Sequence, residues 1–424
     1  MDVEGTVRNR FTLAVTTLLA LAMLAPAGAL AKTKVTFLGH APPSQYGYGF
    51  RVLVDEFNAM QDEVEVELLG SSSSPSTLLP LHAGGLTPDL IYDHLTEQYL
   101  LHGILAPVDE YFERSGIVDW IPGTLDWHTF DGHIYGIPYG LLGQRMVFYD
   151  RDRMSETGLT EPQEGWTWQD LEIRVRRLSR DTDGDGHNDI FGFDMRPGWF
   201  FWPFLINNGS VLYDGERWFP HEERTIEAVE FLAMLAREDL MIRESDGGGD
   251  GFRNFHQRRV ATYAASSRDT QRFRDDPPAF EIGVVHFPVQ RSRGIIVTPR
   301  AFYLGNTNNR QRQDAAWKFI EWALEPPQQT KFLIHGSLLP STISGIRDAQ
   351  AHMVENDPLL IHFANEIAGY SYPYPFVANF SNASDFSTQW MNRALDGLVS
   401  PREAALQIIH LSNAAEAEIR RQRQ

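Results

Sequence analysis

Residues 133–150 constrain the fold of this chain more than any other stretch. The segment holds two short apolar runs, 134–139 and 146–149, separated by one proline and two glycines: Pro138, Gly140 and Gly143. Proline removes a backbone donor and glycine relaxes the backbone, so this combination within a strand pattern indicates a bend or a crossover. Because strand-helix patterns stand on both sides, we interpret the segment as a passage between two lobes, with Tyr139 and Gln144 facing the gap. A hairpin inside one domain explains the same pattern equally well.

The length of the chain supports the interpretation with two lobes. The chain has 424 residues, whereas single hydrophobic cores stop growing at about 250–300 residues. Hydrophobic residues make up 42% and charged residues 22% of the sequence, which are ordinary values for a globular protein. We therefore expect two folded domains.

The first 31 residues carry the pattern of a secretory signal peptide. Arg8 and Arg10 precede an apolar run at 11–24, and Ala29-Leu30-Ala31 supplies the small residues of a cleavage site. The apolar run is too short to span a bilayer. We expect cleavage near Ala31 and export to the periplasm. The sequence contains no cysteine, so neither a disulfide nor a lipid-anchored cysteine is expected.

The net charge restricts the partners. At pH 7 the formal net charge is −19, which repels the phosphates of nucleic acids and anionic lipid headgroups. We therefore expect no nucleic acid and no membrane surface among the partners, and a monomer that acts as a free periplasmic protein.

The chain after the signal peptide begins with a strand-helix-strand pattern. An apolar strand at 35–38 is followed by a helical face of Phe50, Leu53, Phe57 and Met60, and then by a strand in which Val64, Val66 and Leu68 alternate. This order indicates a right-handed βαβ unit and an α/β fold. Ligands of such sheets bind at the carboxyl ends of the strands. That rule indicates residues 39–48 and 71–74, and a third short strand that ends at Asp93-His94.

Two later breaks have the same layout as the first one. Residues 289–293 form a polar linker between apolar strands at 282–287 and 294–304. Residues 336–340 combine a glycine and a proline around an apolar pair. We interpret them as a second and a third crossing between the lobes.

Residues 181–192 resemble the first part of a calcium-binding loop. Asp181, Asp183 and Asp185 take positions 1, 3 and 5, Gly186 takes position 6, and Asp189 takes position 9. Position 12 is Gly192 instead of the usual bidentate glutamate. A structural calcium ion and an Asp-Gly turn whose carboxylates bond local amides are both compatible with this pattern. We expect no other cofactor.

The most aromatic patch of the chain is 199–204. Its tryptophans stand beside prolines and a glycine in a non-periodic stretch, where burial on a regular element is harder to arrange. Sugar rings stack on indole through their apolar faces, so we predict that Trp199 faces a ligand and that Trp202 or Phe204 faces the core. The tyrosines Tyr46, Tyr48, Tyr370, Tyr372 and Tyr374 fit either role.

The sequence lacks the common catalytic motifs. It contains no His-Glu-x-x-His zinc motif, no Gly-x-Ser-x-Gly elbow and no Gly-x-x-x-x-Gly-Lys loop. Asp93 and a second carboxylate could form a glycosidase pair, but nothing in the linear sequence brings two together. We therefore expect a binding protein rather than an enzyme, and keep a secreted carbohydrate-active enzyme as the weaker alternative.

The order of several motifs resembles the extracellular solute-binding proteins of ABC importers, in particular the sugar-binding group that includes maltodextrin-binding proteins. The first motifs are Pro88-Asp89-Leu90, Gly132-His-Ile-Tyr-Gly-Ile-Pro138 and Val147-Phe-Tyr149-Asp150. The later ones are Trp166-Thr-Trp168-x-x-Leu171, Asp183-Gly-Asp185-Gly, Phe200-Phe-Trp202-Pro203, Ala315-Ala-Trp317-x-Phe319-Ile320 and Gly336-x-x-x-Pro340. Each motif is loose alone, but their order and spacing together are specific.

The resemblance implies two α/β lobes with three crossings that close on a ligand in a central cleft. It divides the chain into a signal peptide (1–31), a first lobe (32–142 plus 294–338) and a second lobe (143–293 plus 339–424). It implies transport of a mono- or oligosaccharide to the permease subunits of an ABC transporter. Ligand positions carried over by local match are His40, Asp93, His94, Tyr139, Trp199, Ser266, Arg268 and Tyr372.

Tyr46, Gln144 and Arg300 complete the candidate binding set. Arg268 stands where the family commonly has an aromatic residue, so a charged hydrogen bond replaces one stacking contact. A sugar with an acidic group, a polyol and a non-sugar solute such as glycerol phosphate therefore stay open as alternatives.

Overall fold

The computed structural model describes residues 31–70, 74–94, 97–195, 201–248, 250–373 and 380–423. The predicted signal peptide up to residue 30, residues 71–73 and Trp199 lie outside the described residues. Within the described ranges, nine strands form one mixed sheet with the path β2-β1-β3-β10-β6-β8-β7, beside which β11 pairs with β10 and β9 with β6. The strands are β1 (Thr33–Gly39), β2 (Val64–Gly70), β3 (Leu90–Asp93), β6 (Gly136–Asp150), β7 (Phe191–Asp194), β8 (Val260–Ser266), β9 (Ile282–Val285), β10 (Ile295–Leu304) and β11 (Ser371–Pro373).

The first lobe is built on the predicted βαβ unit. Strand β1 pairs in parallel with β2 and with β3, and α2 (Gln45–Met60) connects β1 to β2. The buried aromatic rings of Phe37, Phe50 and Phe302 pack edge to face or tilted at centroid distances of 5.1–6.0 Å, as aromatic pairs prefer. The other helices of this lobe are α3 (Pro75–Ala83), α4 (Glu97–Leu101), α5 (Asp109–Ser115), α12 (Arg310–Ala323) and α13 (Pro326–Gly336).

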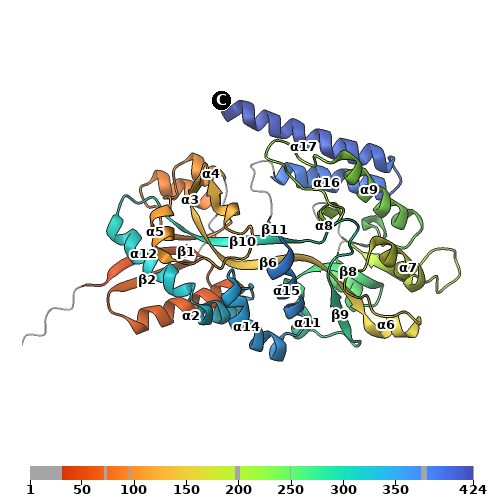
Figure 1. The fold of residues 1–424 in the computed structure, drawn as a ribbon, viewed down its shortest axis with the longest axis horizontal. Helices are drawn as coiled ribbons and strands as arrows, with labels where there is room; N and C mark the ends of the chain where they lie inside the picture. Colours follow the sequence, from red (N-terminus) through yellow and green to blue (C-terminus); the bar gives the residue numbers. More distant parts are fainter. Residues whose placement is uncertain are drawn as a thin grey trace, which may run out of the picture.

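Strand β6 carries the chain from one lobe to the other (Figure 1). Its first half pairs with β10, and its second half pairs with β8 and β9. The segment is therefore a crossing and not a hairpin. We expected two short strands, but the structure has one strand of 15 residues. Gly140 at φ 83° and Arg145 at φ 68° bend it locally without ending the pairing.

The other two breaks also join the lobes. Strand β10 pairs with β11 and β6 at its start and with β3 at its end, so it runs back into the first lobe. Leu339, within the third break, forms a bridge with Leu141 of β6. The exact lobe boundaries predicted from the sequence stay a prediction.

The second lobe surrounds β7, β8 and β9 with helices, and the long C-terminal helix packs on α16 and α9 (Figure 1). Thr167 and Asp170 form a capping box at the start of α7. Trp202 and Phe204 are fully buried, which confirms their predicted place in the core. The helices are α6 (Arg151–Glu156), α7 (Trp168–Leu178), α8 (Trp202–Asn207), α9 (Glu222–Arg237), α10 (Gly251–His256), α11 (Arg268–Asp275), α14 (Ile343–Asn356), α15 (Leu360–Tyr370), α16 (Phe380–Leu395) and α17 (Pro401–Arg423).

Two minor strands, β4 (Thr129–Phe130) and β5 (His133–Ile134), form a separate ribbon before β6. None of the helices among the described residues is both long enough and apolar enough to cross a lipid bilayer.

Candidate functional site

Five of the residues predicted to bind ligand lie together at one end of the first lobe. His40 follows the carboxyl end of β1, Tyr46 lies in the first turn of α2, and Asp93 and His94 stand at the carboxyl end of β3. Arg300 reaches them from β10, whose residue Ala301 pairs with Asp93. This is the sheet edge at which α/β proteins bind ligands.

Arg300 is the centre of this cluster. Its guanidinium lies 3.4 Å from the Asp93 carboxylate and 4.9 Å from the centroid of the Tyr46 ring. Its Nη1 also lies 3.5 Å from Nε2 of His40. One cation thus orders three side chains that come from three different elements.

A β-bulge turns Arg300 toward the cluster. The pairing of β10 with β6 shifts register between Pro299 and Ala301, and Pro299 has no N–H to donate to the ladder. Bulges of this kind leave one residue unpaired and redirect its side chain. The bulge places Arg300 opposite the break in β6 that the sequence predicted.

The start of α2 is fixed by a cap and a close backbone approach. The hydroxyl of Ser44 accepts a hydrogen bond from the Gly47 N–H at 3.1 Å. A Cβ on Gly47 would lie 2.0 Å from the carbonyl carbon of Ala41. Only glycine fits there, and this close approach holds Tyr46 against His40, with ring centroids 5.3 Å apart.

Both histidines of the cluster are held neutral. Burial lowers the pKa of His94 to about 4, and the charge of Arg300 adds to this effect. Burial and then the charge of Arg300 also lower the pKa of His40. Since a carbonyl only accepts, the 3.3 Å contact of His94 Nδ1 with the Pro299 oxygen assigns the proton to Nδ1. The nitrogen of His40 that faces Arg300 is correspondingly an acceptor.

The second lobe contributes Ser266 and Arg268. Ser266 pairs with Gln144 of β6, and its N–H and hydroxyl both donate to Asp269. Gln144 is 5% exposed, and its amide donates to Thr298 at 3.1 Å. The roles of Gln144 and Ser266 in ligand binding stay predictions, since both bond neighbouring protein groups.

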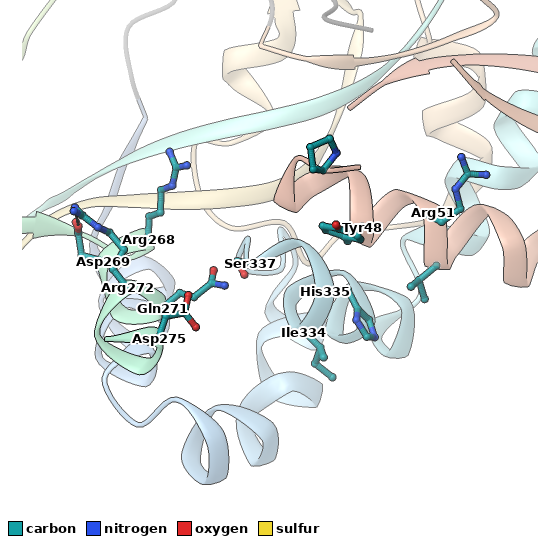
Figure 2. A pocket seen from close by; sticks show the side chains of 12 residues that line it. Tyr48, Arg51, Arg268, Asp269, Gln271, Arg272, Asp275, Ile334, His335 and Ser337 are labelled. Atoms are coloured by element: carbon teal, nitrogen blue, oxygen red, sulfur yellow. Dashed lines mark hydrogen bonds and ion pairs between the residues drawn. The ribbon is translucent and has the colours of Figure 1, made fainter. Parts of the chain in front are cut away.

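A groove of about 870 Å³ lies between the two lobes, and its lining does not include the five residues of the cluster (Figure 2). Helix α2 forms one wall with Tyr48 and Arg51, and helix α11 forms the other with Arg268 and Gln271. The end of α13 adds Ile334 and His335 to the lining. Its volume lies in the range of small-molecule sites.

The prediction that Tyr139 faces the cleft is wrong. Tyr139 is 1% exposed, and its ring packs on Phe302 and Phe332 with centroids 4.5 and 5.0 Å apart. Side chains alternate between the faces of a strand, and at this position the core face is the one occupied. Tyr139 is therefore a core residue of the first lobe.

The remaining predicted ligand residues are not part of the cluster. Tyr372 is half-buried in β11, and its hydroxyl oxygen accepts a hydrogen bond from the Leu212 N–H at 3.0 Å. Trp199 lies outside the described residues, so the structure does not place it. Their contacts with a ligand stay predictions.

The acidic loop at 181–189 has features of both a calcium-binding loop and an Asp-Gly turn. Asp181, Asp183 and Asp189 offer oxygen atoms that all lie within 4.8 Å of one another, as a hard cation requires. The same carboxylates accept local hydrogen bonds, for example Asp181 from Gly184 and Gly186. Asp185 is outside this group of three and accepts from His187. The donor set therefore fits calcium, and calcium binding stays a prediction.

Arg51, His335 and Ser337 line the groove and were not predicted from the sequence as ligand contacts, whereas Tyr48 belongs to the predicted range 39–48. Tyr48 and Arg51 stand three residues apart on α2 and share one face of it. That spacing is a signal in the sequence that could have pointed to Arg51, and the structure leaves Tyr48 52% exposed. No sequence pattern predicts that His335 and Ser337 line the groove, because their position depends on how α13 packs beside α2.

Comparisons with known proteins agree with this geometry. The family described as bacterial extracellular solute-binding protein matches residues 52–360. The maltotriose-binding protein of Pyrococcus abyssi (strain GE5 / Orsay) is 21% identical over 337 residues, which cover 75% of this chain and 68% of that protein.

Solved structures share the fold. The sugar-binding protein MalE of Xanthomonas citri superimposes with a TM-score of 0.78 at 20% identity, covering 92% of this chain and 98% of that one. The cyclic alpha-maltosyl-1,6-maltose binding protein of Arthrobacter globiformis does so with a TM-score of 0.77 at 19% identity, covering 90% and 98%. The predicted two-lobed α/β fold is thereby confirmed.

The family match spans well over half of the chain, and the fold, the three crossings and the groove between the lobes agree with it. This chain therefore belongs to the bacterial extracellular solute-binding proteins.

Proposed function

We propose that this protein is the periplasmic substrate-binding component of an ABC transporter, which binds a mono- or oligosaccharide by hinge closure and delivers it to the membrane permease subunits. The observation that carries the proposal is the Asp93–Arg300 pair, 3.4 Å apart at the edge of the first lobe. A sugar hydroxyl both donates and accepts, so neighbouring hydroxyls fit a carboxylate beside a guanidinium. Tyr46 adds an aromatic ring beside this pair.

The relatives support a carbohydrate as the ligand. The similar proteins described above include one that binds maltotriose and one that binds cyclic alpha-maltosyl-1,6-maltose. The first-lobe cluster contains one carboxylate, Asp93, whereas hydrolysis of a glycoside needs two that flank the bond. Both points favour binding over catalysis.

Hinge closure follows from the connections between the lobes. Strands β6 and β10 run through both lobes, so the lobes can rotate about them and bring α11 toward α2. Export, cleavage near Ala31, a monomeric state and a structural calcium ion at Asp181, Asp183 and Asp189 belong to the same proposal.

Isothermal titration with a panel of neutral mono- and oligosaccharides tests the proposal. We expect a saturable signal for at least one sugar and a loss of at least tenfold in affinity for Asp93→Asn, because the carboxylate that accepts sugar hydroxyls is gone. The matched control is Asp62→Asn, which should leave affinity unchanged. The Asp62 side chain is fully exposed, and its carboxylate lies 3.5 Å from the Lys32 ammonium group. Binding of glycerol phosphate or a polyol, with silence across all sugars, would contradict the carbohydrate proposal.

A further inference from the structure

One of the arginines that line the groove between the lobes pairs with none of the residues that the structure describes. Three arginines line the groove, namely Arg51, Arg268 and Arg272. Arg51 pairs with Asp55 at 3.7 Å, and Arg272 donates to Asp269 at 3.1 Å and stacks over Phe252. Arg268 is exposed and has neither an ion pair nor a hydrogen bond from its side chain to any described residue.

The acidic residues on the same helix do not neutralise Arg268. One oxygen of Asp269 accepts two hydrogen bonds from Ser266, and the other accepts from Arg272. Asp275 stands seven residues further along α11, about 10 Å along the helix axis. Figure 2 shows the side chain of Arg268 extending away from Asp275.

The facing wall of the groove offers no negative charge either. Its lining residues are Pro43, Tyr48, Arg51, Val52, Ile334, His335 and Ser337, and none of them carries a carboxylate. Asp55, which follows Arg51 on α2, is paired with Arg51 at 3.7 Å. An oxyanion bound between the two walls would therefore give Arg268 the negative partner that the lining of the facing wall does not supply.

We propose that the ligand is an acidic saccharide, whose oxyanion is a uronic acid carboxylate or a sulfate or phosphate ester, and that Arg268 is the residue that selects it. This inference rests on the proposed carbohydrate function and narrows it from sugars in general to anionic ones. A guanidinium binds a planar carboxylate or a tetrahedral ester through two parallel N–H donors. Gln271, Tyr48 and Ser337 line the same groove and supply neutral polar groups for sugar hydroxyls.

Matched pairs of ligands test the inference by isothermal titration at low ionic strength. The pairs are glucose with glucuronate, glucose 6-phosphate and glucose 6-sulfate, and galactobiose with digalacturonate. We expect at least one anionic member to bind tenfold or more tightly than its neutral partner, since a hydrogen bond to a charged group is worth more than a neutral one. The preference should shrink as sodium chloride is added. The member that binds best identifies the oxyanion.

Two variants assign the preference to Arg268. Arg268→Gln should bring the affinity for the anionic ligand to within about threefold of that for the neutral one, while thermal unfolding stays unchanged because the side chain is exposed. Arg347→Gln makes the same change of charge at an exposed arginine of α14 that does not line the groove, and it should keep the preference.

Equal binding of neutral and anionic members, or a preference that survives Arg268→Gln, would overturn the inference and leave the proposed carbohydrate function intact. If no saccharide gives a binding signal, both the proposed function and this inference are overturned. Binding of glycerol 3-phosphate alone would also overturn both, because the site would then recognise an oxyanion without a sugar.

Discussion

The guanidinium of Arg300 and the carboxylate of Asp93 form an ion pair across two antiparallel strands, β10 and β3, at the edge of the first lobe. Their side chains are 18% and 20% exposed. The pair is thus ordered by the fold and still reaches solvent, which is what a preformed half of a binding site needs.

Arg300→Gln should weaken ligand binding by at least tenfold. The change removes the cation that orders Asp93, His40 and Tyr46, so the free energy of ordering them must come from the ligand. The pKa of His40 should rise toward its ordinary value, because the charge of Arg300 is one of the causes that lower it. Titration calorimetry and an NMR titration of the His40 ring measure both effects.

The control for Arg300 is Arg310→Gln. Arg310 pairs with Glu110 and Asp314 on the exposed surface of the same lobe. Its replacement should leave both affinity and the His40 pKa unchanged. Equal losses in the two variants would show that Arg300 acts through general stability and not through the cluster.

Tyr139→Phe should leave affinity unchanged and raise the free energy of unfolding by up to about 1 kcal/mol. The Tyr139 hydroxyl is buried and has no hydrogen-bond partner among the described residues, so its removal relieves an unsatisfied polar group. Urea unfolding measures the change.

Tyr92→Phe is the matched comparison for Tyr139→Phe. The Tyr92 hydroxyl donates to the backbone oxygen of Tyr139 at 2.8 Å in the same core. Its removal should lower the free energy of unfolding by about 1 kcal/mol. If Tyr139→Phe lowers affinity and Tyr92→Phe does not, the Tyr139 hydroxyl contacts the ligand after all.

The stability of the protein should fall as the pH drops from about 6.5 to about 4. The pKa of His94 is about 4 in the folded protein against 6.5 in the unfolded chain, so the unfolded state binds the proton first in this window. The effect amounts to at most about 3 kcal/mol and is absent above pH 7.

Urea unfolding at several pH values, compared between the wild type and His94→Gln, isolates the contribution of His94. The variant should show a shallower decline between pH 6.5 and pH 4. Parallel curves for the two proteins would show that His94 titrates normally.

Calcium should raise the melting temperature, and a chelator should lower it, if the loop at 181–189 binds the ion. A ligand that binds only the folded state stabilises it in proportion to the logarithm of its concentration above Kd. Asp181→Asn and Asp189→Asn should abolish the shift, because both residues belong to the convergent group.

Asp214→Asn is the matched control for the calcium loop. Asp214 also caps a turn, accepting from the N–H groups of Glu216 and Arg217, but it is outside the convergent group of carboxylates. This variant should keep the calcium shift. If neither calcium nor the chelator changes the melting temperature, the Asp-Gly turn interpretation is favoured.

Local patterns in the sequence predicted the elements that depend on local physics. The βαβ unit around α2 and the burial of Trp202 and Phe204 are found as expected. Caps, helical spacing and breaks at proline and glycine act within a few residues, so a linear sequence carries them.

The sequence by itself therefore determined the α/β class, the three breaks between lobes and the residue types of the binding cluster. Only the tertiary structure decided that Arg300 orders the cluster, because its partner Asp93 stands 207 residues away in the chain. It also decided that Tyr139 faces the core, since bulges and positive φ angles in β6 and β10 reset which face each side chain takes. A shift of one residue reverses the direction of a strand side chain, and such shifts are set by pairing with distant strands.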